Sequence, residues 1–139
     1  MPEKLTPEII RIEVQRFWKM FQDKNTDAIH RCYAPEAMVF SSSGSRPEPG
    51  RLASARRERE YFQAKTVVNV KLGQMDVAML GDHAAVCGYS FDFDATQVAT
   101  GLDNNAEEHL HDGRVTQVFC YDSEGQLRIM HEHISVAHK

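Results

Sequence analysis

The sequence predicts an α+β fold in which three N-terminal helices precede a strongly curved antiparallel sheet. Apolar residues recur at helical spacing near the N-terminus, whereas from residue 67 onward they alternate with polar residues at strand spacing. No helical pattern returns after residue 64. We expect one domain spanning 1–139, because a chain of 139 residues normally builds a single core.

The first predicted helix begins at Thr6 and ends near Asp23. Thr6 supplies a hydroxyl cap, Pro7 suits the first turn, and Glu8 carries an acid near the positive helix end. The apolar residues that recur at helical spacing are Ile10, Val14, Phe17, Trp18 and Phe21.

A second, shorter helix is expected from Thr26 to about Tyr33, and Pro35 should close it. A short strand then follows at 38–41. The segment 42–50 is rich in Ser, Pro and Gly and therefore indicates a loop. Residues 51–64 indicate a third, charged helix.

Four long strands are predicted in the second half of the chain, joined mainly by short turns. The turns are expected at Gly81-Asp82 and at 122–125, and a polar excursion at 97–105. The strands are expected at 67–80, 83–95, 113–121 and 126–137.

Composition excludes several classes of function. The formal charge of −4 argues against a nucleic-acid partner, which normally requires a basic face. No apolar stretch is long enough to span a bilayer, and the N-terminus lacks the apolar core of a secretion signal. Three widely spaced cysteines, Cys32, Cys87 and Cys120, are typical of reduced thiols, so we expect a cytoplasmic protein.

Two long segments of the chain resemble a known family. They are QRFWKMFQDKNTDAIHRCYAPEAMVF at 15–40, and GRVTQVF followed by EGQLRIMHEHIS near the C-terminus. Both are similar to the SnoaL-like group of the nuclear transport factor 2-like superfamily. The resemblance implies a cystatin-like cone, in which the sheet curls around the long helix and leaves an internal pocket. The group includes polyketide cyclases, ketosteroid isomerases and kinase association domains, so the fold alone does not determine an activity.

The isomerase comparison can be made residue by residue. The tyrosine that would donate to the oxyanion falls on Phe17, and the aspartate that would carry the proton falls on Ser41. The supporting tyrosine falls near Phe62 and the protonated acid near Gln117. Because that reaction needs a carboxylate base and buried donors at these positions, we expect no isomerase activity of this type.

Glu132 is the candidate catalytic residue, because a carboxylate that faces an apolar pocket can serve as a base. The alternative is a structural ion pair with Arg128 or plain surface exposure. The residues expected to line the pocket are Phe17, Phe21, Tyr33, Ser41, Tyr61, Gln117, Phe119, Met130 and Glu132.

Two histidines, His131 and His133, lie two residues apart on the last predicted strand. If Tyr121 lies opposite Gln126, Thr116 lies opposite His131 and Arg114 opposite His133, so the four polar residues share one face. Two imidazoles beside an arginine are a poor metal site, and we expect neither a metal nor a cofactor. The cluster suits either an anion or a subunit interface.

Three functional hypotheses follow, and they leave open whether the protein is an enzyme. The first is a small-molecule-binding protein whose hydrophobic pocket takes a small hydrophobic or carboxylate ligand. The second is a proton-transfer or cyclase-type enzyme with Glu132 or a histidine as the base. The third is an oligomeric association module without a pocket ligand.

The last hairpin predicts a homodimer packed through the sheet face. Both of its faces carry apolar residues, and no helix remains after residue 64 to cover the second one. The expected faces are Val118, Leu127 and Ile129 on one side, and Phe119, Met130 and Ile134 on the other.

Overall fold

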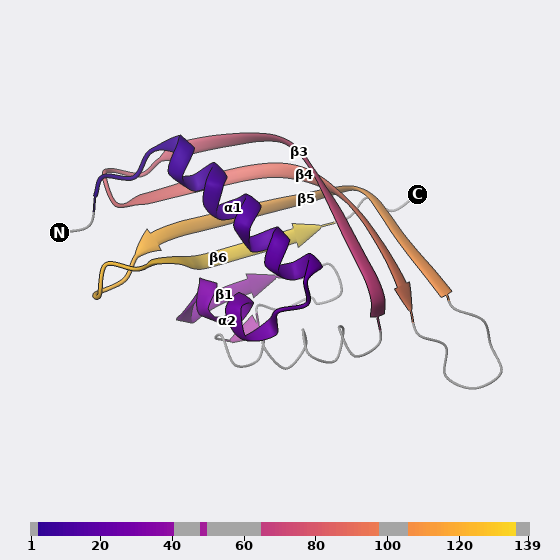
Figure 1. The fold of residues 1–139 in the computed structure, drawn as a ribbon. Coiled ribbons are helices and arrows are strands. Elements are labelled where there is room, and N and C mark those ends of the chain that lie inside the picture. The colour runs from indigo at the N-terminus through magenta and orange to yellow at the C-terminus, as the bar shows by residue number, and fades with distance from the viewer. Residues whose placement is uncertain (1–2, 41–47, 50–64, 98–105, 136–139) are drawn as a thin grey trace.

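A computed structural model describes residues 3–40, 48–49, 65–97 and 106–135. Two helices come first, and all the described strands join one sheet in the order β2-β1-β6-β5-β4-β3 (Figure 1). The elements are α1 (Pro7–Gln22), α2 (Thr26–Cys32), β1 (Tyr33–Phe40), β2 (Glu48–Pro49), β3 (Lys65–Met79), β4 (Ala84–Gln97), β5 (Ala106–Tyr121) and β6 (Leu127–Ser135).

The α+β class is confirmed, but the sheet is mixed and not wholly antiparallel. Strands β3 to β6 form the expected antiparallel meander. Strand β1, by contrast, runs parallel to β6. The alternation of apolar residues predicts that a strand exists but not which edge it joins, so this pairing could not be predicted locally. The predicted third helix at 51–64 lies outside the described residues.

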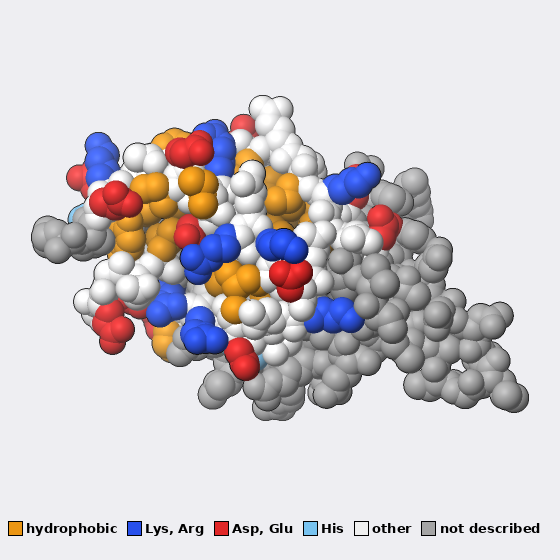
Figure 2. Space-filling model, viewed as in Figure 1, with side chains coloured by type: hydrophobic (Ala, Val, Ile, Leu, Met, Phe, Trp, Pro, Cys, Tyr) orange, Lys and Arg blue, Asp and Glu red, His pale blue; other side chains and the backbone are white. Residues whose placement is uncertain are grey.

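Helix α1 has the predicted bounds. The Ile9 N–H donates to the hydroxyl oxygen of Thr6 at 3.2 Å, and the Asp23 N–H donates to the Lys19 carbonyl at 3.0 Å. Its apolar side chains face the sheet, which the helix crosses diagonally (Figure 1). Both signs of charge are interspersed over the opposite, solvent-facing side of the molecule (Figure 2).

The second helix is shorter than predicted. It ends at Cys32, and Tyr33 is already extended, with φ −95° and ψ 142°. Strand β1 therefore begins at Tyr33 and not at Met38. The cause is Pro35, which holds the residue before it in extended geometry and so prevents the helix from continuing.

The long strands bend part of the way along their length, and α1 crosses the sheet on one side (Figure 1). Their ladders carry register shifts between Leu72 and Met75 and between Phe91 and Phe93, and such irregularities increase local twist. The inner face of the sheet is the one that packs against α1. Its buried residues on β4 are Ala85, Cys87, Tyr89 and Phe91.

The β5–β6 hairpin corrects the predicted pairing. Tyr121 lies opposite Leu127, and the pairs Thr116–His133 and Val118–His131 replace Thr116–His131 and Arg114–His133. The segment between the paired residues Tyr121 and Leu127 is 122–126, one residue longer than the predicted turn, and within it the Asp122 N–H donates to the Gln126 carbonyl at 2.8 Å.

A second shift occurs at Met130, the extra residue of a bulge between the Phe119–Ile129 and Val118–His131 pairs. The shift at the turn and the shift at Met130 cancel for all residues after Met130, so His131 and His133 lie on the predicted face of the sheet. Leu127 and Ile129 lie between the two shifts and are therefore on the opposite face from the predicted one. Both belong to the inner face, where Ile129 is fully buried.

Candidate functional site

A chain of hydrogen bonds runs through the core between α1 and the sheet. The Trp18 indole N–H donates to the Tyr89 hydroxyl oxygen at 2.7 Å. The Tyr89 hydroxyl donates to Gln117 Oε1 at 2.7 Å, and Gln117 Nε2 donates to Glu132 Oε1 at 2.7 Å. The Tyr33 hydroxyl donates to Glu132 Oε2 at 2.8 Å. We call these five residues the polar chain.

Sheet pairing explains how the polar chain is assembled. Gln117 and Glu132 lie directly opposite each other on β5 and β6, so both side chains point to the inner face. Tyr89 lies on the next strand, β4, and Tyr33 is the first residue of β1. Gln117 is 0% exposed, Tyr33 is 2% exposed and Glu132 is 3% exposed.

The surroundings keep the neighbouring donors neutral. Burial raises the pKa of the Cys87 thiol to about 12, although a backbone hydrogen bond from Gln117 opposes this, and the negative charge of Glu132 adds to the rise. Burial likewise raises the pKa of Tyr89 well above 10.0, with Glu132 again contributing. Tyr89 therefore keeps its proton and remains a donor near neutral pH.

The arrangement suits one chemical task in particular. Each oxygen of Glu132 accepts one hydrogen bond from the polar chain. A carboxylate held in this way can accept a hydrogen bond, or a proton, from a bound molecule. The two donors also fix the position of the carboxylate.

The predicted pocket residues fall into three groups. Five are buried in the core, namely Phe17, Tyr33, Gln117, Phe119 and Glu132. Phe21 and Met130 are partly buried against it. Ser41 and Tyr61 lie outside the described residues.

The alternative role predicted for Glu132, an ion pair with Arg128, is wrong. Arg128 instead pairs with Asp122, with 3.1 Å between Nε and Oδ2. Glu132 is buried and not exposed on the surface.

Two members of the polar chain were not predicted as site residues. Trp18 was expected only as one of the apolar residues of the first helix, and Tyr89 was not singled out within its predicted strand. The available signal was the polar atom that each aromatic ring carries, because a buried indole N–H or phenol normally finds a partner. Their contact joins residues 71 positions apart, which the spacing of either segment does not reveal.

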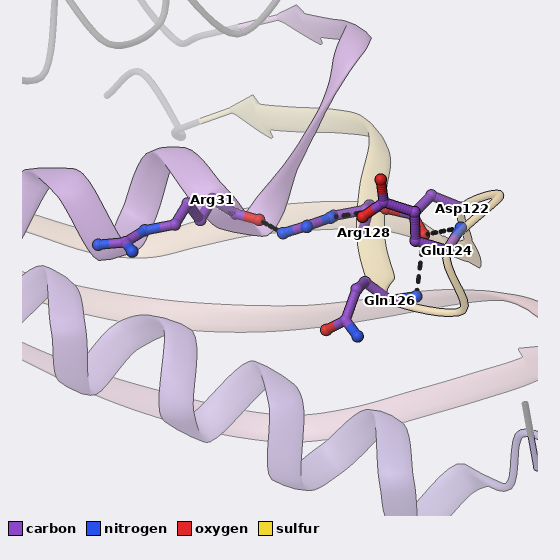
Figure 3. A network of polar contacts seen from close by, with 5 residues as sticks. All are labelled: Arg31, Asp122, Glu124, Gln126 and Arg128. Carbon is purple, nitrogen blue, oxygen red and sulfur yellow. Dashed lines mark hydrogen bonds and ion pairs between the residues drawn. The ribbon is translucent and has the colours of Figure 1, made fainter.

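A surface depression of about 590 Å³ lies at the end of the sheet near the β5–β6 turn. Arg128 crosses its wall, donating to the Arg31 carbonyl and pairing with Asp122 (Figure 3). The pKa of the Asp122 carboxyl is lowered mainly by a hydrogen bond from the Gln126 backbone N–H, and contacts that include Arg128 lower it further. Of the residues predicted to line a pocket, only Met130 lines this depression. The residues around the depression are Ala34, Pro35, Glu36, Cys120, Tyr121, Asp122, Ser123, Glu124, Arg128 and Met130.

The four predicted polar strand residues lie on the outer face of the sheet, away from Glu132. Arg114, Thr116 and His133 are exposed, and His131 is half-buried. Phe40 of β1 stacks on His133, with ring centroids 5.6 Å apart, and meets His131 edge-on at 6.2 Å.

Within the described ranges, no group of three or more His, Cys, Asp or Glu side chains is placed to hold a metal ion. None of the helices described has the length and apolarity to cross a bilayer.

The chain shares its α+β fold with solved proteins of the nuclear transport factor 2-like superfamily. A superfamily protein from Salmonella enterica serovar Typhimurium is 21% identical, with a TM-score of 0.79, and the match covers 95% of this chain and 91% of that one. The chain belongs to the SnoaL-like domain family, whose model matches residues 10–139.

Two further solved structures share the fold at low identity. A Streptomyces avermitilis protein, provisionally named a dehydratase of the NTF2-like family, is 12% identical with a TM-score of 0.80, covering 95% of this chain and 97% of that one. A Xanthomonas campestris protein, provisionally named a calcium/calmodulin dependent protein kinase II association domain, is 14% identical with a TM-score of 0.74, covering 99% and 95%. Comparison with curated proteins gives no match.

Proposed function

We propose that this protein binds a small, mainly apolar molecule at the inner face of the sheet, and that Glu132 is its polar contact. The observation that carries the proposal is a carboxylate held by two donors and 3% exposed, in a core whose other members are mostly apolar. Ligand sites commonly combine apolar walls with a few fixed polar groups. A buried carboxylate is costly unless it is fully hydrogen-bonded, which favours a functional reason for retaining it.

The chemistry of Glu132 narrows the ligand. A carboxylate accepts hydrogen bonds, so it favours a ligand with a hydroxyl group or an acidic C–H. It disfavours a second carboxylate, because two like charges in a poorly hydrated site repel each other. Of the two predicted ligand types, the hydrophobic one therefore fits the polar chain. A carboxylate ligand would suit the exposed Arg114 on the outer face instead.

A matched ligand pair tests this proposal. 2-Naphthol offers a bicyclic apolar body and one hydroxyl donor, and 2-methoxynaphthalene has the same body with the donor blocked. We expect calorimetry to show tighter binding of 2-naphthol to the wild type. The Glu132→Gln variant should weaken that binding by roughly tenfold or more, because a hydrogen bond to a charged acceptor is lost. Glu8→Gln, an exposed carboxylate on α1, serves as the control and should change nothing.

Equal affinity for both ligands, or equal affinity of wild type and Glu132→Gln for 2-naphthol, would exclude Glu132 as the polar contact. Absence of binding by 2-naphthol and by a panel of cyclic ketones would exclude the site itself. The comparison with Glu132→Gln requires that the variant unfolds at the same denaturant concentration as the wild type.

A second candidate function is proton transfer on a hydrophobic substrate. The support is again Glu132, because the two donors orient its carboxylate at the inner face of the sheet, and a buried carboxylate can serve as a base. In such a step Glu132 takes a proton from a carbon next to a carbonyl. The C–H electron pair forms a C=C bond while the π pair of the carbonyl moves onto its oxygen to give an enolate, and Glu132 then returns the proton to a carbon of the enolate system as the carbonyl re-forms. The likeness to a provisionally named dehydratase supports this class without fixing the substrate.

Hydrogen–deuterium exchange separates binding from catalysis. 2-Tetralone has acidic C–H groups next to its carbonyl, and proton NMR in deuterium oxide follows their exchange. An enzyme of this class should accelerate the exchange, and Glu132→Gln should remove the acceleration. Exchange that survives both Glu132→Gln and the double change His131→Ala/His133→Ala would remove all three residues as the base. Binding without any acceleration would leave the first proposal and end the second.

A third candidate is association without a pocket ligand, and it includes the proposed homodimer. Exposed or half-buried apolar side chains on the outer face support it, among them Met38 at 55% exposure, Phe40, Val86 and Val118. The move of Leu127 and Ile129 to the inner face leaves the hairpin itself contributing less to this surface than predicted. Light scattering at micromolar concentration should report twice the chain mass, a large ring would favour an association module, and a monomer would exclude both.

We also propose a cytoplasmic location. The three free cysteines support it, because unpaired thiols persist in reducing compartments. Fractionation of the native cells should recover the protein with the cytosolic markers, and recovery with secreted proteins would contradict it.

A further inference from the structure

We propose that Trp18 is a positioning residue, which fixes the direction of the polar chain and thereby holds the amide of Gln117 with its N–H toward Glu132. The inference deepens the proposed role of Glu132 and takes its functional meaning from it. It concerns the charge state of the site, and its test needs no ligand.

The donor-to-acceptor direction of the polar chain follows from the chemistry of its first residue, Trp18. An indole N–H can only donate, so the Tyr89 oxygen accepts from Trp18 at 2.7 Å. The single proton of Tyr89 is then directed at the other neighbour, the Gln117 side chain, at 2.7 Å. A side-chain amide has one accepting and one donating end. Since Tyr89 donates, Gln117 turns its oxygen to Tyr89 and its nitrogen to Glu132.

The reversed arrangement would violate hydrogen bonding at two places. If Gln117 were flipped, its N–H would face the Tyr89 oxygen, which already accepts from Trp18, and the Tyr89 proton would lose its acceptor. The amide oxygen would also face a carboxylate oxygen of Glu132, and that contact requires a proton on Glu132. A flip is therefore coupled to protonation of Glu132, and Trp18 opposes both.

The groups facing Glu132 come from several elements. Tyr33 at the start of β1 donates to it and Gln117 of β5 donates to it. Cys87 and Tyr89 on β4 also lie near it, and their pKa values are raised first by burial and further by the charge of Glu132. Val39 of β1 is its register partner on the other side. Donors that point at a carboxyl group favour its ionised form. The directed chain thus presents Glu132 as an acceptor, the state that a base or a hydroxyl-binding group needs.

Titration of the Glu132 carboxyl carbon tests the inference in the intact protein. Protein labelled with ¹³C-glutamate would be followed by NMR across the pH range in which it stays folded. Trp18→Phe removes the first donor, and Tyr89→Phe removes the link between Trp18 and Gln117. In both variants Gln117 becomes free to flip, and we expect the titration midpoint of Glu132 to rise by roughly one pH unit, the equivalent of one charged hydrogen bond.

Phe21→Leu is the matched control. The Phe21 ring packs edge-on against Trp18 with centroids 5.1 Å apart, and it has no part in the polar chain. This variant loosens the packing of Trp18 without removing a hydrogen bond of the chain, so the Glu132 midpoint should stay at the wild-type value. Unchanged midpoints in both Trp18→Phe and Tyr89→Phe would overturn the inference, as would an equal shift in Phe21→Leu.

A measurement on the wild type covers the case in which a variant fails to fold. A neutron structure of deuterium-exchanged wild-type crystals should show the Gln117 amide deuterons on the atom that faces Glu132, and the Tyr89 hydroxyl deuteron directed at Gln117. Amide deuterons on the atom that faces Tyr89 would show the flipped amide and overturn the inference. Either result leaves the ligand tests above intact, so failure of the inference is distinguishable from failure of the proposed function.

Discussion

Replacing Tyr89 by phenylalanine removes one oxygen atom from the middle of the polar chain and leaves the ring in place. The hydroxyl serves two partners at once, accepting from Trp18 and donating to Gln117, both at 2.7 Å and both in the buried core. The substitution therefore leaves the Trp18 N–H and the Gln117 oxygen without their partner. No methylene group is lost, so the effect isolates hydrogen bonding from packing.

The expected cost follows from those two orphaned groups. A buried donor or acceptor left unsatisfied costs about 1–3 kcal/mol, and part of this is recovered if Gln117 reorients toward another partner. We expect Tyr89→Phe to lower the free energy of unfolding by about 2–4 kcal/mol. A matched control is Tyr121→Phe, because that ring is half-buried and its described contact is an edge-on packing against His83. The control should cost less than about 0.5 kcal/mol.

Urea denaturation measures both variants. The protein has a single tryptophan, and because Trp18 belongs to the polar chain, its fluorescence reports directly on the region that is perturbed. Far-ultraviolet circular dichroism should give the same midpoint if unfolding is two-state. A Tyr89→Phe protein whose free energy of unfolding lies within about 0.5 kcal/mol of the wild-type value would refute the reasoning, because the polar chain would then contribute nothing measurable to stability.

Three other substitutions test separate features. Gly113→Ala should destabilise the fold by about 1–3 kcal/mol in thermal denaturation, because the added Cβ would meet Phe91 ring carbons at 2.7 and 2.8 Å. Gly88→Ala is the control and should cost much less, because the nearest atom to its added Cβ is 3.8 Å away. The lowered pKa of Asp122 gives stability that is present above the usual value of 3.8 and is lost as the pH falls through the folded value, so Asp122→Asn should flatten the acid end of a stability profile. The pKa of Cys87 rises from 9.0 to about 12 in the folded protein, so the stability that it contributes is complete below pH 9.0 and is lost as the pH rises toward 12. Cys87→Ala should therefore reduce the loss of stability over this alkaline range, as measured by urea denaturation.

The fold was predictable where local chemistry determines structure. Thr6 and Pro7 marked the start of α1, and the alternation after residue 67 marked the meander. The same logic failed at β1, because Pro35 was taken only as the end of a helix and not as evidence that the residues just before it were already extended. That β1 runs parallel to β6 depends on long-range packing, which no local pattern contains.

The site was predictable to a similar degree. The inward positions of Glu132, Gln117 and Tyr33 were expected, and these residues do meet. The pairing that led to them was wrong by one residue at the turn, and the bulge at Met130 restored the alternation. No glycine or proline marks that bulge in the sequence, so its position could not be predicted. Contacts between distant segments, such as that of Trp18 with Tyr89, required the structure.

The most direct test of the central claim is a crystal structure of the wild-type protein soaked with 2-naphthol. The account predicts the ligand at the inner face of the sheet, with its hydroxyl within about 3 Å of a carboxylate oxygen of Glu132 and its rings against the apolar core. Density for the ligand only in the surface depression beside Tyr121 and Arg128 would contradict the claim. So would an inner face that stays closed around Glu132 at saturating ligand.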